Sequence, residues 1–229
     1  MIDVTTYTAP PSAPASINNS DDIKSSAYAV TESIEDGKLD INPYDGILVA
    51  CYSVHPLVPE LRTWLSDRDM PKPVMGIFEA SILTAQLLIG PPSSESWGIV
   101  TTGTFWEDHL EQGVRACLGQ GEGQVANDID FFAGVYTTGL NAGDFHRLAR
   151  EEVDGRLKVA AKELFESGGV TCVVMGCAGM AGLEGIIRAA AAELNNGEEV
   201  KNLHVVDGVK AGVMQLDQAI RSRQVFGPS

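Results

Sequence analysis

Two of the four cysteines stand where a thiol could do chemistry. The segments GILVACYSVHPLVPELR (46–62) and VTCVVMGCAGMAGLEGIIR (170–188) each run from an apolar stretch through a cysteine, Cys51 or Cys177, to a helical pattern. In both, the cysteine stands where the predicted strand ends. A thiol there lies near backbone N–H groups and the positive end of the next helix, and both lower the pKa of a thiol. The sequence therefore predicts two activated sulfurs.

The alternative for any cysteine is inert packing, because cysteine is among the most often buried residue types. Cys172 lies inside an apolar run, and Cys117 shares the periodic face of a helix with Val114. Both are predicted to pack in the core. The four cysteines lack the dense, even spacing of a disulfide framework, which favours free thiols in a reducing compartment.

The elements that must position these residues can be read from hydrophobic patterns. Strands are predicted at 47–50, 73–77, 97–102, 131–138, 170–175 and 203–207, with a weaker candidate at 3–8. Helices are predicted at 21–35, 57–65, 79–88, 107–118, 152–167, 183–195 and 209–221. The strand runs are nearly continuous in apolar residues, as expected of strands buried on both faces of a parallel sheet. Their alternation with helices predicts a doubly wound α/β fold, in which ligands bind beyond the carboxyl ends of the strands.

The stretch IGPPSSES (89–96) is the best internal linker, since two prolines and three serines separate two helix and strand systems. It predicts a molecule of two lobes.

Charge and hydropathy restrict the partners. Lys and Arg total 16 against 31 Asp and Glu, a net charge of −15, which would repel a phosphate backbone. No nucleic-acid partner is therefore expected. No run approaches the ~20 apolar residues of a membrane span, and the opening residues lack the pattern of a leader peptide. A cytoplasmic protein without a membrane partner is expected.

Six strings carry a resemblance to a known family: VACYSVHP, GIFEAS, VTTGTFW, VYTTGLNA, VVMGCAGMAG and VVDGVKAGV. In this order they resemble the aspartate/glutamate/hydantoin racemase superfamily, and in particular the fungal members of its hydantoin/allantoin racemase family. The resemblance implies two pseudo-symmetric α/β lobes with mainly parallel sheets flanked by helices. It places the active site in the cleft between the lobes, with no cofactor. It also implies a small-molecule substrate and a homo-oligomer.

The same resemblance gives the domain boundaries and the catalytic pair. Residues 1–92, completed by a returning segment at 206–229, would form the first lobe, and residues 93–205 the second. Each lobe would supply one catalytic cysteine, Cys51 and Cys177. Racemisation requires a base on one face of the carbon and an acid on the other, and thiols serve because thiol and thiolate interconvert once a pKa is lowered.

Hydroxyl groups near the strand ends are candidates for holding the charge of the carbanion or enolate intermediate. Ser53 and Thr102 are preferred to Thr104 as substrate-binding residues, with Thr101 also at the end of its strand. Thr104 has an equally good alternative, because TFWE places Glu107 at the spacing of a helix capping box.

Two further residues have both a binding and a structural interpretation. His55 could be a proton relay or thiolate partner for Cys51, or a local hydrogen-bonding group at a helix start. Glu79, in GIFEAS, is preferred as a helix cap, although the family carries glutamate there and it could shape the cleft. The histidines are scattered and no zinc spacing occurs, so no metal is expected.

The residues after each cysteine bear on the substrate. Amino-acid racemases of the superfamily carry Asn-Thr there, whereas this chain has Tyr52-Ser53 and Ala178-Gly179. These followers favour a cyclic amide such as a 5-substituted hydantoin or allantoin, with Ala178 and Gly179 counted among the substrate-binding residues. An aspartate or glutamate racemase remains an alternative, as does a non-catalytic ligand-binding or interaction protein on a racemase-like scaffold.

The chain opens at what resembles the second strand of the family. Roughly the first βα unit of the family is therefore expected to be missing from this chain. Catalytic competence would depend on whether that unit is present.

Overall fold

The computed structural model describes residues 2–90, 95–119 and 131–227 and contains two parallel sheets. In the smaller sheet, β1 (Ile47–Val49) pairs with β2 (Val74–Gly76). The larger sheet has the order β4-β3-β5-β6, formed by β3 (Ser96–Thr101), β4 (Phe132–Thr137), β5 (Val170–Met175) and β6 (His204–Asp207). All of these pairs are parallel. The predicted α/β fold with parallel sheets and flanking helices is confirmed.

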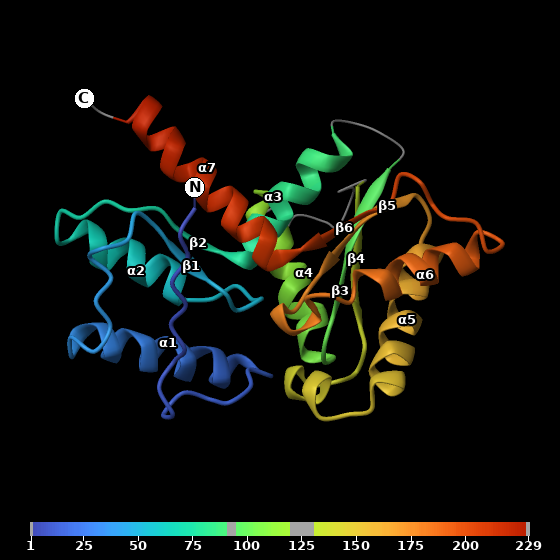
Figure 1. Ribbon diagram of the computed structural model, residues 1–229, viewed down its shortest axis with the longest axis horizontal. Coiled ribbons are helices and arrows are strands. Elements are labelled where there is room, and N and C mark those ends of the chain that lie inside the picture. The colour runs from blue at the N-terminus through green and yellow to red at the C-terminus, as the bar shows by residue number, and fades with distance from the viewer. Residues whose placement is uncertain (1, 91–94, 120–130, 228–229) are drawn as a thin grey trace.

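The smaller sheet packs with two helices, α1 (Ser20–Glu35) and α2 (Leu57–Ser66), on the left of Figure 1. Apolar side chains of β1, β2, α1 and α2 share one cluster that includes Val49, Leu61 and Val74. Helix α1 begins where it does because the side chain of Asn19 accepts two backbone N–H groups of its first turn.

The larger sheet is covered by helices on both faces. Alternate side chains of β3 point to opposite faces, with Ile99 in one core cluster and Val100 in the other. Helices α3 (Ile77–Ile89) and α4 (Phe105–Cys117) contribute to the cluster that contains Ile99. Helices α5 (Arg150–Glu166) and α6 (Glu184–Leu194) contribute to the cluster that contains Val100.

Helix α7 (Gly208–Phe226) links the two sheets. It follows β6 directly, and the side chain of Asp207 caps it by accepting the N–H groups of Val209 and Lys210. From there α7 runs back to pack against α3, β1 and β2 (Figure 1). The chain also forms two short 3₁₀ helices, η1 (Ala142–His146) and η2 (Ala178–Met180).

The predicted elements are found with shifts of a few residues at their ends, except for the candidate strand at 3–8, which is wrong. Residues 2–8 are exposed and form no strand. A short polar segment without a buried face has nothing to hold it against a sheet. Of the predicted linker, residues 91–94 lie outside the described residues, so a lobe boundary at 92 stays a prediction. Helix α3, assigned to the first lobe, packs on the larger sheet and shares its core.

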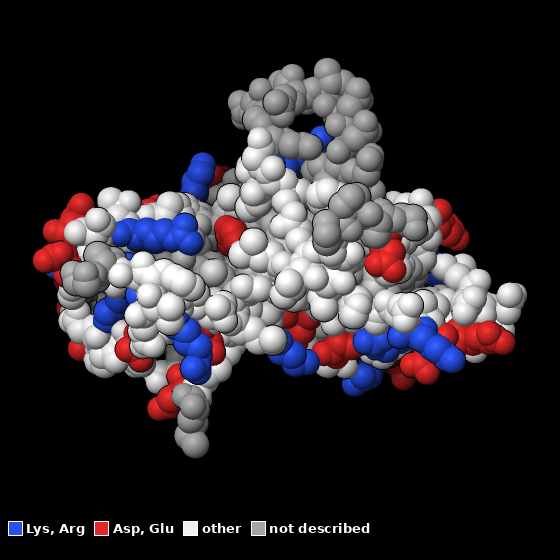
Figure 2. Space-filling view, turned by 90° about the horizontal axis from the view of Figure 1, so that it is seen from above, with Lys and Arg blue, Asp and Glu red and all other residues white. Residues whose placement is uncertain are grey.

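Acidic and basic side chains are interspersed on the face shown in Figure 2, around a broad uncharged area. The positive charges do not gather there into the stripe that would follow a nucleic-acid backbone. Among the described residues, no helix is both long enough and apolar enough to cross a membrane.

Candidate active site

The two cysteines that the sequence pairs stand at equivalent places in the two sheets. Cys51 comes two residues after the end of β1, and Cys177 two residues after the end of β5. Both side chains are partly buried. Burial is the main cause of the raised pKa of Cys51, and a negative charge on Cys177 adds to it. Both predicted residues therefore lie just beyond the carboxyl ends of parallel strands.

The predicted lowering of the two thiol pKa values is wrong. Burial raises the pKa of Cys51 to about 11, and the hydroxyl of Ser53 only partly opposes it. Burial also raises the pKa of Cys177, although hydrogen bonds from the N–H groups of Gly179 and Met180 partly lower it. The stabilising N–H groups that the sequence argument invoked are present at Cys177, but the loss of water outweighs them. Burial therefore favours the protonated form of both thiols.

Main-chain contacts fix the turn that carries Cys177. The N–H of Gly176 donates to the carbonyl of Val100 at 2.7 Å, and the hydroxyl of Thr101 donates to the carbonyl of Gly176 at 2.7 Å. A Cβ on Gly176 would lie 2.7 Å from Thr101 Cβ and 2.8 Å from Ile99 Cγ2, so only glycine fits there. Thr101, considered from sequence as a strand-end hydroxyl, instead holds the peptide next to the thiol.

Beyond Cys177 the chain turns into η2. Cys177 is the N-cap residue, and its Sγ accepts the N–H of Gly179 at 3.4 Å. Ala178 is exposed and Gly179 is half-buried. A Cβ on Gly179 would lie 3.5 Å from Cys177 Sγ and 3.7 Å from His146 Nε2. Sequence reasoning missed His146, since it lies far from either cysteine along the chain and in no motif.

Buried side chains support the turn that carries Cys51. The Oγ of Ser53 is 3.4 Å from Cys51 Sγ, and the Ser53 side chain is fully buried. Tyr52 points into the core, where its hydroxyl is hydrogen-bonded to Ser81 Oγ at 2.9 Å and its ring packs edge-on against Phe78. Of the predicted hydroxyl groups, Ser53 is therefore the one in contact with a thiol.

The two threonines after β3 differ in their surroundings. Thr102 is buried, and its carbonyl accepts the N–H of Gly139 and the hydroxyl of Thr138. Thr104 is exposed, and its side chain makes no cap bond to α4, so the predicted capping box with Glu107 is wrong. Thr104 already has helical backbone angles, whereas a capping side chain needs an extended residue.

His55 and Glu79 both serve the ends of helices. His55 is buried, and its Nδ1 accepts the backbone N–H of Leu57 at 3.3 Å in the first turn of α2. Burial lowers the pKa of His55 to about 4, so the imidazole is neutral. Glu79 is the third residue of α3. Burial raises the pKa of its carboxyl group, while the N–H groups of Glu79 and Gly76 and the positive charge of Arg62 lower it. These contacts favour the local structural interpretation of each residue.

The two remaining cysteines separate in their environments. Cys172 is fully buried in the core, as predicted. Cys117 is exposed, so its predicted packing role is wrong. It is the last residue of α4, where the helix has passed the end of the buried face that holds Val114.

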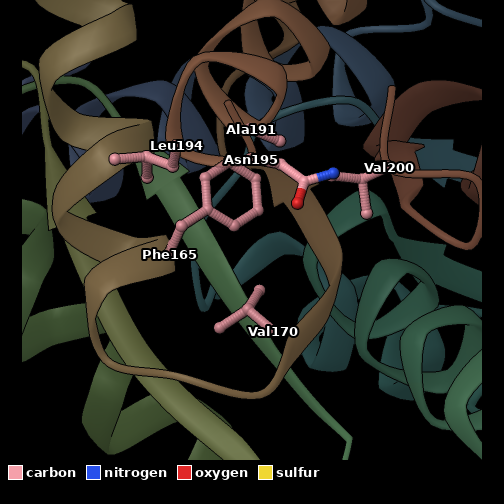
Figure 3. A pocket seen from close by; sticks show the side chains of 6 residues that line it. All are labelled: Phe165, Val170, Ala191, Leu194, Asn195 and Val200. Carbon is pink, nitrogen blue, oxygen red and sulfur yellow. The ribbon is translucent and has the colours of Figure 1, made fainter. Parts of the chain in front are cut away.

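A pocket of about 230 Å³ lies at the opposite end of β5 from Cys177. Figure 3 shows its apolar lining from the ends of α5 and α6, with Phe165, Val170 and Leu194 around it. Neither thiol lines this pocket. Among the described residues, no group of three or more His, Cys, Asp or Glu side chains is arranged to hold a metal ion.

Comparison with known proteins shows which family this chain belongs to. The sequence profile described as Asp/Glu/Hydantoin racemase matches residues 3–216. An uncharacterized protein of Schizosaccharomyces pombe is 33% identical over 214 residues, which cover 93% of this chain and 78% of that protein. Hydantoin racemase of Paenarthrobacter aurescens is 28% identical over 173 residues, which cover 76% of this chain and 64% of that protein.

A solved structure shares the fold. Allantoin racemase of Pseudomonas fluorescens superposes with a TM-score of 0.68 at 22% identity, over 96% of this chain and 77% of that chain. At this identity the likeness concerns the fold.

Proposed function

Because this chain belongs to the Asp/Glu/hydantoin racemase family, we propose that it racemises a cyclic amide of the hydantoin or allantoin class with Cys51 and Cys177 as its acid and base. The observation that carries the proposal is the equivalent placement of two partly buried thiols, each two residues beyond the end of a parallel strand. Ligands of parallel α/β proteins bind at this edge of the sheet.

A pair of thiols on opposite walls suits the reaction. Two thiolates facing one substrate would repel each other, so a state with one thiolate and one thiol would be favoured over a state with two thiolates. Racemisation needs this mixed state, because one sulfur removes the proton while the other delivers one to the opposite face. The carbon next to the carbonyl of a hydantoin ring is acidic enough to be a substrate for such a pair.

The residues around the thiols would bind the ring. The Ser53 hydroxyl lies 3.4 Å from Cys51 Sγ and the Gly179 N–H donates to Cys177 Sγ, so each would have to turn from sulfur to substrate to hold the enolate oxygen. Thr102 is a further candidate, and Ala178 next to Cys177 is exposed and would face the substrate. Thr104, His55 and Glu79 would act at most at the edge of the site, since their present contacts are structural.

The site would lie between two lobes, 1–92 with 206–229 and 93–205. Helix α7 supports this division, because it leaves the larger sheet at β6 and packs on β1 and β2.

Racemisation in deuterated water tests the proposal. Purified protein given one enantiomer of allantoin or of a 5-substituted hydantoin should lose optical rotation and add deuterium at the chiral carbon faster than a solution without protein. Cys51→Ala and Cys177→Ala should each abolish the enzymatic rate. Cys117→Ala is the matched control, because Cys117 is an exposed thiol at the last residue of α4 and not one of the proposed pair, and it should retain full activity.

If the wild type does not exceed the protein-free rate with either substrate, the proposed activity is wrong. If one of the two site variants racemises like the wild type, the two-thiol mechanism is wrong even though the protein is a racemase.

A further inference from the structure

His146 faces Cys177 across a gap that exists because residue 179 is a glycine. The position of the missing Cβ is 3.5 Å from Cys177 Sγ and 3.7 Å from His146 Nε2. The two atoms therefore flank one small volume, where η1 and η2 contact each other. In Figure 1 these are the yellow and orange turns at the lower centre. His146 is an exposed residue.

The backbone does not explain the glycine. Gly179 is not among the residues with positive φ, so an alanine would fit the local conformation. Its methyl group would meet the sulfur and the imidazole nitrogen at ordinary contact distances. What glycine provides is the absence of a side chain between a thiol and an imidazole, and a water molecule that joins the two by hydrogen bonds is part of the proposal made below.

A two-thiol racemase needs such a connection after every turnover, an argument that rests on the proposed function. The sulfur that acted as base leaves the reaction carrying the proton of the substrate, and the sulfur that acted as acid leaves it as a thiolate. Before the same enantiomer can react again, the first must lose a proton and the second must gain one. Both protons are exchanged with solvent, since the product has departed.

We propose that His146 is the group through which Cys177 exchanges its proton with solvent. When Cys177 must lose a proton, His146 accepts it through the bridging water and passes it on to solvent. When Cys177 must gain one, the proton moves in the opposite direction. Imidazole suits this role because it both accepts and donates protons near neutral pH.

His55, the histidine nearest to a site thiol in the sequence, is unsuitable for this role. His55 is buried, its Nδ1 accepts the N–H of Leu57, and its pKa is lowered to about 4. His146 acts through Cys177 and not on the substrate, so its loss should leave the capture of substrate intact.

Steady-state kinetics of His146→Gln test this role. In the conversion of one enantiomer, kcat should fall by about 10²-fold, the lower range for a positioned acid or base, while kcat/KM stays unchanged. The split arises because kcat includes the return of the free enzyme to its starting protonation state, and kcat/KM does not. Added imidazole should restore kcat, as no purely structural role would allow. His204→Gln is the matched control, since His204 is an exposed histidine at the opposite end of the larger sheet.

A second variant tests the space at residue 179 separately from the histidine. Gly179→Ala keeps His146 but fills the space, so kcat should fall and added imidazole should not restore it. If His146→Gln keeps the kcat of an active wild type, or loses kcat/KM in equal proportion, the proton-exchange role is wrong while the proposed function stands. An inactive wild type would overturn the proposed function itself.

Discussion

The turn that carries Cys177 and the turn that carries Cys51 are held in different ways. β5 lies inside the larger sheet between β3 and β6. Its end is fixed by two hydrogen bonds of Gly176, whose N–H donates to the Val100 carbonyl and whose carbonyl accepts the Thr101 hydroxyl. β1 pairs with β2 alone among the described strands, and the support of its turn comes from side chains, chiefly Tyr52 in the core. One sulfur of the site is therefore set by backbone geometry and the other by side-chain packing.

The largest expected effect is on the backbone-held turn. Gly176→Ala places a Cβ within 3 Å of Thr101 and Ile99 in a fully packed core, so the peptide must move and carry Cys177 with it. Displacement of a reacting group by about 1 Å can cost about 10²-fold in rate, and we expect a loss of racemisation of that order. Racemase assays and thermal unfolding measure the two consequences.

Gly185→Ala is the control for this change. Gly185 lies in α6 with open space around its Cα, so an added methyl group meets nothing within 4 Å. Normal activity of Gly176→Ala would show that the Cys177 turn tolerates movement and would remove the contrast between the two turns.

The next effect is a dependence of racemisation on pH that both turns share. Burial favours the neutral thiol, so the pKa of Cys51 is about 11 and the pKa of Cys177 is also raised. Below these pKa values the fraction of enzyme with one thiolate grows by about tenfold per pH unit. The rate corrected for the protein-free reaction should therefore rise from neutral towards alkaline pH. His55 adds no dependence in this range, because its pKa is about 4.

A profile that is flat between about pH 7 and pH 9 would contradict this expectation, since it would mean that one thiol is already ionised at neutral pH. Repeating the measurement with Cys117→Ala excludes a contribution from the exposed thiol.

The smallest effects separate the two turns most directly. Thr101→Val and Tyr52→Phe each remove one buried hydroxyl and its hydrogen bond, and each should lower the free energy of unfolding by about 1 kcal/mol. Only Thr101→Val should also slow racemisation, because it removes the bond to the peptide adjacent to Cys177, whereas the ring in Tyr52→Phe stays packed against Phe78 and still supports the Cys51 turn. Urea unfolding and kcat, measured on both variants, test the difference.

Thr101→Ser restores the hydroxyl without the methyl group and should recover most of the rate. If Tyr52→Phe slowed racemisation as much as Thr101→Val did, the proposed division between backbone and side-chain support would be wrong.

The sequence alone determined the order of strands and helices, the parallel α/β class and the family. These follow from local patterns, because continuous apolar runs such as 170–175 and periodic helices record burial along the chain itself. The sequence also singled out Cys51 and Cys177, since each ends a strand run. It failed at residues 3–8 and at Cys117, where pattern indicated burial but the described residues leave these positions exposed.

Only the tertiary structure decided the electrostatics and the supporting contacts of the site. The pKa of a thiol depends on how much water the whole fold removes, and the sequence showed only the nearby N–H groups that oppose this effect. The bond from Thr101 to Gly176 and the approach of His146 to Cys177 join segments that are far apart in the chain. Such contacts leave no periodic signal, because they arise from the packing of one strand end or turn against another.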